Sequence, residues 1–340
     1  MLKWELYPAQ DFEKYREQWD RLNIELYQGQ PFFDSRFVEP VLKYFATGKE
    51  RLCVHLHNGK IDGLLILTPR RTGVWSLFAP SQAQIVPILL KDDTILPSLF
   101  TSLPNFSLSL EFLNQDPSLT PIQANFNQLA ITREPHALTI AIKITDNFEE
   151  YWSSRSKKLQ QNHGRYFRRL QKKSLSMRME CREEPSQINE AVIRYGIMES
   201  QGWKGLQGTS IQANNVQGAF YAQLMKEFAV SGNASVYELY FNDRLVASRL
   251  CILNSDMLIM LKTTYDEEFS EHAPGRLLLH AVIEQEFAQK RVKKIEFYTN
   301  ATQDQISWST EQRYIQHVTL FRHSLLKKAY QAKNVIRGKI

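Results

Sequence analysis

Apolar and polar residues alternate along this chain in two periods, which predicts a mixed α/β protein. The two-residue period of strands is expected at 2–7, 51–57, 61–69, 74–78, 107–113, 136–145, 235–241, 245–253, 257–263, 293–298 and 314–322. The wider spacing of amphipathic helices is expected at 11–27, 36–47, 96–103, 148–173, 186–200 and 218–230, with a further helix from Pro274.

The segment from Met257 to Tyr298 organises the second half of the chain. It reads as a buried strand, a polar loop, a helix opened by Ala273-Pro274-Gly275, and a further strand. Proline is favoured in the first turn of a helix, and helix N-termini attract anions through backbone N–H groups and the helix dipole. The segment therefore predicts an anion site. The alternative, a helix packed on a sheet without a ligand, stays open because such units are common.

The chain also contains an internal repeat. Residues 57–77 align with residues 241–261 at a constant offset, and both read as two successive hairpins with their turns in register. This pattern predicts two duplicated halves. Only the second half has a Pro-Gly pair opening a strong helix after its third strand, whereas the first half has Ala79-Pro80-Ser81-Gln82 there. We therefore expect a cofactor in the second half alone.

Composition narrows the class of protein. A chain of 340 residues with 43% apolar residues can fill two cores, and no window resembles a membrane span or a signal peptide. Cys53, Cys181 and Cys251 show no metal-ligand spacing, and we expect them to be buried thiols of a cytoplasmic protein without a bound metal. The net charge of +6 is concentrated in two segments, a run at 155–182 and a tail at 322–340.

The order of strands, anion loop, helix and strand, in a chain of two duplicated halves with a basic helical run between them, resembles the GNAT acyltransferases. It is similar to the acetyltransferases associated with cellulose and exopolysaccharide biosynthesis and to the Fem peptidoglycan aminoacyltransferases, which use aminoacyl-tRNA. The resemblance extends to about Arg322. It rests on Pro31-Phe32 with Ser35, Trp152 to Leu170, Trp203-Lys204-Gly205 with Gly208, and Tyr265-Asp266 to Leu278.

The resemblance implies a fold of two tandem GNAT-like domains, each a mixed, mostly antiparallel sheet flanked by helices. We expect an N-terminal degenerate domain at 1–145, a C-terminal domain with the acyl-CoA site at 146–322, and a basic tail at 323–340. The implied reaction is attack of an amine on the thioester of acetyl-CoA or another acyl-CoA. The implied acceptor is an amino sugar or polysaccharide precursor, and the oligomeric state stays open.

Site residues follow from these expectations. Donor contacts are expected from backbone groups and one charged side chain at Lys262, Thr263, Thr264, Pro274, Gly275, Arg276, Leu277 and Leu278. The candidates for a general base are Asp266, Glu296 and Glu238, with a solvated or capping carboxylate as the alternative for each. His272 is a candidate acid, with a structural role as the alternative. Residues expected to contact an anionic acceptor are Lys157, Asn162, Arg165, Arg168, Trp203, Lys204 and Trp308.

Alternative interpretations of the two basic segments and of the function stay open. The basic helix could be a solvated face, and the tail could lie on an anionic membrane surface or be a solvated terminus. The chain also departs from the family pattern, because Asp304-Gln305 stands where a Tyr-Lys pair is common before Trp308. The other functions to be weighed are therefore a Fem-type transferase that uses aminoacyl-tRNA and a catalytically inactive scaffold.

Overall fold

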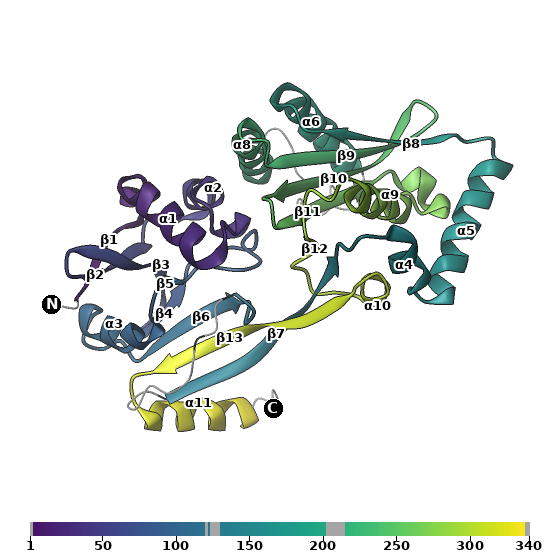
Figure 1. Cartoon of the computed structure of the whole chain (residues 1–340). Coiled ribbons are helices and arrows are strands. Elements are labelled where there is room, and N and C mark those ends of the chain that lie inside the picture. The colour runs from purple at the N-terminus through teal and green to yellow at the C-terminus, as the bar shows by residue number, and fades with distance from the viewer. Residues whose placement is uncertain (1–2, 120–121, 123–129, 202–214, 337–340) are drawn as a thin grey trace. The chain divides into compact units, whose positions relative to one another are not determined.

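The computed structural model describes residues 3–119, 122, 130–201 and 215–336. The chain divides into two compact units (Figure 1). Unit 1 consists of residues 1–138 and 313–340, and unit 2 of residues 139–312. The expected boundary near residue 145 is thus placed a few residues earlier, and residues 313–322 join unit 1 instead of the second domain.

The sheet of unit 1 has the strand order β1-β2-β3-β4-β6-β13. Its strands are β1 (Lys3–Pro8), β2 (Arg51–His57), β3 (Lys60–Arg71), β4 (Val74–Leu77), β6 (Ser109–Gln115) and β13 (Glu311–Phe321), and β5 (Leu89–Leu90) pairs with β3. Neighbouring strands are antiparallel except β4 and β6, which are parallel. The connection between these two strands contains α3 (Leu96–Ser102). The remaining helices of this unit are η1 (Ala9–Tyr15), α1 (Arg16–Tyr27), η2 (Pro31–Phe33), α2 (Ser35–Phe45), η3 (Asp93–Ile95) and α11 (Ser324–Ile336).

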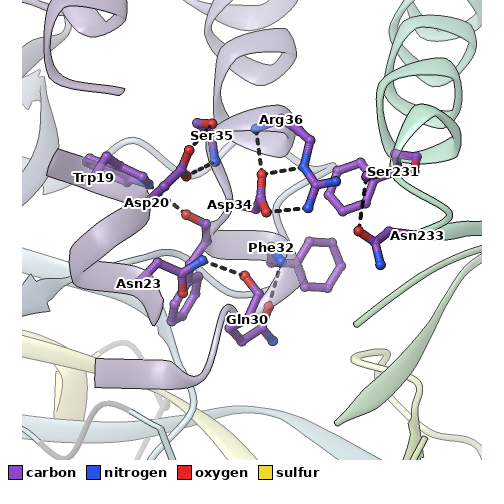
Figure 2. Close-up of polar contacts among 12 residues, drawn as sticks. Trp19, Asp20, Asn23, Gln30, Phe32, Asp34, Ser35, Arg36, Ser231 and Asn233 are labelled. Atoms are coloured by element: carbon purple, nitrogen blue, oxygen red, sulfur yellow. Dashed lines mark hydrogen bonds and ion pairs between the residues drawn. The ribbon is translucent and has the colours of Figure 1, made fainter. Parts of the chain in front are cut away.

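Polar side chains fix the turn between α1 and α2, as Figure 2 shows. Asp20 accepts hydrogen bonds from the N–H of Ser35 at 2.8 Å and from its hydroxyl at 2.7 Å. The side chain of Gln30 accepts from the N–H of Phe32 at 2.5 Å, and Asp34 caps α2 through the N–H of Arg36 at 2.9 Å. The Pro31–Ser35 run, part of the family resemblance, is therefore held by contacts inside unit 1.

The sheet of unit 2 repeats this order as β8-β9-β10-β11-β12-β7. Its strands are β8 (Met177–Arg182), β9 (Ala234–Phe241), β10 (Arg244–Leu253), β11 (Met257–Tyr265), β12 (Lys294–Glu296) and the end of β7 (Ala130–Lys143). The parallel pair is now β11 and β12, joined through α9 (Pro274–Gln289). The other helices are α4 (Phe148–Ser153), α5 (Lys157–Lys172), α6 (Pro185–Gln201), α8 (Val216–Val230), η4 (Glu267–His272) and α10 (Gln303–Ile306).

Helices cover both faces of the sheet of unit 2. Tyr237 and Glu238 are consecutive on β9 and therefore point to opposite faces. The hydroxyl of Tyr237 bonds to Glu286 of α9 at 2.5 Å, whereas Glu238 accepts from Arg194 of α6 at 2.7 Å. The α9 face carries a core that includes Leu278, Val282 and Phe287.

The fold confirms the two tandem GNAT-like sheets. The aligned repeats fall on β2-β3-β4 and β9-β10-β11, and their first turns adopt the same left-handed backbone at Asn58 and Asn242. The pattern missed β8, α10 and the helical form of the tail, and it merged α4 with α5. Ser156 separates those two helices, because its side chain accepts from the N–H of Leu159 and caps α5.

Candidate active site

The β11–β12 ladder covers all of the short β12 and only the first part of β11. The parallel ladder joins Met257, Leu258 and Ile259 to Lys294, Ile295 and Glu296, and it stops there while β11 continues to Tyr265. Just beyond the last rung, the register of β10 with β11 shifts between Leu250 and Cys251, which leaves Leu261 as an extra residue in β11. Such a bulge bends a strand. The predicted donor residues Lys262, Thr263 and Thr264 follow this bulge, in the part of β11 that has no rung to β12.

The helix α9 begins after this part of β11 in the chain. Its N-cap, Ala273, is in the left-handed region with φ of 51° and supplies no side-chain cap among the described contacts. The N–H groups of Arg276 and Leu277 donate to the carbonyl of Ala273 at 3.0 and 3.1 Å. The side chains of Leu277 and Leu278 are buried in the core, so only their backbone can meet a ligand.

Arg276 is engaged by side chains of the protein itself. Its guanidinium contacts both carboxylate oxygens of Asp304 in α10 at 3.1 and 3.0 Å and donates to the hydroxyl of Tyr166 in α5 at 2.6 Å. A donor phosphate that recruits Arg276 therefore competes with Asp304. The sequence analysis considered Asp304 only as a departure from the family pattern and did not assign Tyr166 to the site.

The basic helix α5 packs against this same region. Besides the Tyr166 contact, Arg169 donates to the carbonyl of Glu271 in η4 at 2.6 Å. Lys157, Arg165 and Arg168 are exposed, and Arg165 bonds to Asn162 one turn earlier at 3.1 Å. Three of the four predicted acceptor residues on α5 are thus exposed, and helical spacing puts them on the side of α5 opposite the Tyr166 contact with Arg276.

Two of the predicted carboxylates, Asp266 and Glu238, are held by arginines. Asp266 caps η4 through the N–H of Glu268 at 3.0 Å and pairs with Arg244 at 2.6 Å. Glu238 accepts from Arg194, from Arg182 at 3.0 Å and from Tyr240 at 3.1 Å. Although burial opposes it, these bonds lower the pKa of Glu238 below its usual value, which makes it a weaker base.

The third carboxylate, Glu296, lies on the last rung of the β11–β12 ladder. It is opposite Ile259 on one side and Ala141 of β7 on the other, and its side chain is fully buried. Lys294 pairs with it at 3.0 Å. Among the three predicted carboxylates, Glu296 is therefore the one placed where the strands separate.

The predicted aromatic contacts differ in outcome. Trp308 is buried beside Trp152 at 5.7 Å between ring centroids, in a cluster that also holds His163 and His280, so its ring does not face solvent. His272 is buried next to Phe241 and Phe269. Trp203 and Lys204 lie outside the described residues.

Within the described ranges, no group of three or more His, Cys, Asp or Glu side chains is arranged to hold a metal ion. The helices that the structure describes include none that is long and apolar enough to cross a membrane.

Comparisons with known proteins agree with this geometry. Residues 157–305 match the family model of the acetyltransferase (GNAT) domain. No curated protein sequence matches the chain. The matched residues fall within unit 2.

Among solved structures, FemX is similar over 89% of this chain and 95% of its own, with a TM-score of 0.60 and 9% identity. A conserved protein of unknown function from Bacteroides thetaiotaomicron VPI-5482 gives a TM-score of 0.58 at 9% identity, covering 94% of this chain and all of that one. The C-terminal domain of a putative lysylphosphatidylglycerol synthetase from Agrobacterium fabrum gives 0.54 at 11% identity, covering 90% and 96%. These similarities concern the fold.

Proposed function

We propose that this protein is an N-acyltransferase that moves an acyl group from acetyl-CoA or another acyl-CoA to an amine. The observation that carries the proposal is that β11 extends past its ladder with β12 through a bulge, and that the next long helix, α9, starts without a side-chain cap. A GNAT domain match over the same residues supports it. For a donor of this kind we propose a cytoplasmic location.

The donor would bind with its diphosphate at Gly275 and its acyl arm in the slot between β11 and β12. The start of α9 offers the positive end of the helix dipole to the phosphates. Backbone N–H groups near the bulge of β11 would polarise the thioester carbonyl.

The acceptor would be an amine that also carries negative charge. The exposed Lys157, Arg165 and Arg168 of α5 favour an anionic molecule such as an amino sugar in a polysaccharide precursor. As the amine attacks the thioester it loses a proton, and Glu296 at the end of the ladder is the carboxylate placed to receive it, directly or through a water. The thiol of CoA leaves and takes up a proton.

Calorimetric titration with CoA and acetyl-CoA tests the donor assignment, and Gly275→Ala sharpens it. A Cβ at Gly275 would meet only Tyr265 at 3.6 Å, an ordinary contact, so the fold tolerates alanine. If the diphosphate approaches this backbone, the methyl group should weaken CoA binding about tenfold or more. Gly164→Ala in α5 is the matched control, because its Cβ would meet only the flexible end of Arg168 at 3.4 Å. Absence of any CoA binding to the parent protein would reject the proposal.

A Fem-type transferase using aminoacyl-tRNA is the second candidate, favoured by the basic surface of α5 and by the fold shared with FemX. The two functions are separated by their donors. Binding of CoA without binding of aminoacyl-tRNA supports the first, and the reverse supports the second. Binding of neither leaves the inactive scaffold.

A further inference from the structure

A buried arginine next to the proposed donor slot lacks an acidic partner. Arg249 of β10 is 6% exposed, yet no carboxylate among the described residues pairs with it. Its Nε has no hydrogen-bond partner in the described chain, and Nη1 contacts the sulfur of Met260. Thioether sulfur is a weak acceptor, and an unpaired charge in a protein interior costs several kcal/mol in stability, about as much as a broken buried ion pair.

The surroundings do not compensate this charge. The groups that act on it electrostatically are Cys251, Tyr195 and Tyr237, all neutral at pH 7, and burial lowers the pKa of the guanidinium below its ordinary value. Other arginines of the same sheet are neutralised, for example Arg182 and Arg194 by Glu238. Of these three arginines, only Arg249 keeps a buried positive charge without a carboxylate partner in the described chain.

The position of Arg249 on β10 puts it beside the part of β11 that extends beyond the ladder with β12. Its cross-strand neighbours are Tyr237 on β9 and Thr263 on β11, so all three side chains share one face of the sheet. Its sulfur partner, Met260, is the first residue of β11 beyond the last rung of the β11–β12 ladder. Thr263, half-buried, lies on the part of β11 that has separated from β12.

We propose that Arg249 binds a carboxylate of the ligand that occupies the slot between β11 and β12, and so selects an acyl group or an acceptor that bears one. This inference rests on the proposed acyl-CoA function and adds the charge of the substrate. A guanidinium presents paired N–H donors that match a carboxylate, and burial strengthens such a pair. Two substrates can supply this carboxylate. One is the donor, if its acyl group is dicarboxylic and ends in a carboxylate, and the other is the acceptor.

Calorimetry with matched thioesters tests the donor source. Succinyl-CoA and butyryl-CoA have acyl chains of the same length and differ in the terminal carboxylate. If the carboxylate belongs to the donor, the parent protein should bind succinyl-CoA at least tenfold more tightly than butyryl-CoA. Arg249→Met should remove that preference and leave butyryl-CoA binding within about twofold.

The acceptor source is tested by initial rates with acetyl-CoA. Glucosamine and its counterpart oxidised to a carboxylate at carbon 6 are the matched amines. If the carboxylate belongs to the acceptor, KM for the acidic sugar should be at least tenfold lower than KM for glucosamine in the parent protein, and Arg249→Met should abolish the difference. Arg249→Lys, which keeps the charge without the paired donors, should retain part of the preference.

Thermal unfolding gives an independent readout. Because methionine removes an uncompensated buried charge and fills similar volume, Arg249→Met should unfold at the same or a higher temperature while the carboxylate preference disappears. Acetyl-CoA binding with no carboxylate preference from either source would overturn this inference and leave the acyltransferase proposal standing. Failure to bind any CoA thioester would overturn both.

Discussion

Two histidine rings stack in the core of unit 2, and they make stability depend on pH. His163 of α5 and His280 of α9 lie 3.8 Å apart between ring centroids, with Trp152 against both. Burial lowers the pKa of His163 to about 4, and burial together with the charge of His163 lowers that of His280 to about 3. Both rings are therefore neutral in the folded protein at pH 7.

We expect the free energy of unfolding to fall as the pH is lowered from about 7 to 5. Below the ordinary histidine pKa of 6.5 the unfolded chain binds protons that the folded rings do not, so acid favours unfolding. The loss should be about 1–2 kcal/mol per ring at pH 5, from 1.36 kcal/mol per pKa unit. Urea unfolding of the parent and of His280→Phe at several pH values measures it. The variant should show a smaller slope, and equal slopes would contradict the assignment.

Glu296 and Glu238 are both buried carboxylates of unit 2, and we expect them to respond differently to mutation. Glu296→Gln keeps the size and removes the proton acceptor, so kcat should fall about 100-fold or more with CoA affinity unchanged. Initial rates and calorimetry separate the two effects. An unchanged kcat would exclude Glu296 as the base.

For Glu238→Ala we expect lost stability instead. The change leaves Arg182 and Arg194 without their shared partner, and unfilled hydrogen bonds of this kind cost about 1–3 kcal/mol. Thermal and urea unfolding measure the loss. CoA affinity of the folded variant should match the parent, and a selective loss of affinity would place Glu238 in the donor site.

Among the elements, α9 was the easiest to predict and α10 the hardest. Pro274 and a long apolar stripe define α9 from sequence, and its observed start matches the expectation. The short α10 has no apolar period and is held by a capping box between Thr302 and Gln305. Its contact with α9 also depends on the tertiary structure, because Asp304 reaches Arg276 only after both helices have packed together.

The contact between α9 and α10 predicts opposite changes in CoA affinity for substitutions at its two ends. Asp304→Asn should free Arg276 for a donor phosphate and tighten CoA binding severalfold, whereas Arg276→Ala should weaken it. Calorimetric titration of both variants checks this. Equal affinity in all three proteins would remove Arg276 from the donor site.

The two units share a topology but differ where a donor would bind. In unit 1, β4 pairs with β6 from Val74 to Ser76 and ends at Leu77, so no long strand end separates from its neighbour. Its crossover helix α3 has 7 residues against 16 in α9. Unit 1 therefore shows the same strand order without the slot.

We accordingly expect one CoA per chain. Calorimetry gives the stoichiometry, and hydrogen exchange should show CoA-dependent protection in β11 and the start of α9 but not in β4 and α3. Protection that appears equally in β4 and α3, or two bound equivalents, would contradict a single donor site.

Local sequence by itself determined the order of strands and helices, the duplication, and the start of α9, because periodicity, turn residues and helix caps act over a few neighbouring residues. Tertiary structure decided the pairings of strands distant in sequence: β13 pairs with β6 of unit 1, and the end of β7 pairs with β12 of unit 2. It also decided the partners of charged residues. Contacts between residues distant in the chain decide that Glu238 pairs with arginines, that Arg276 pairs with Asp304, and that Arg249 has no carboxylate partner among the described residues. No local pattern records such contacts.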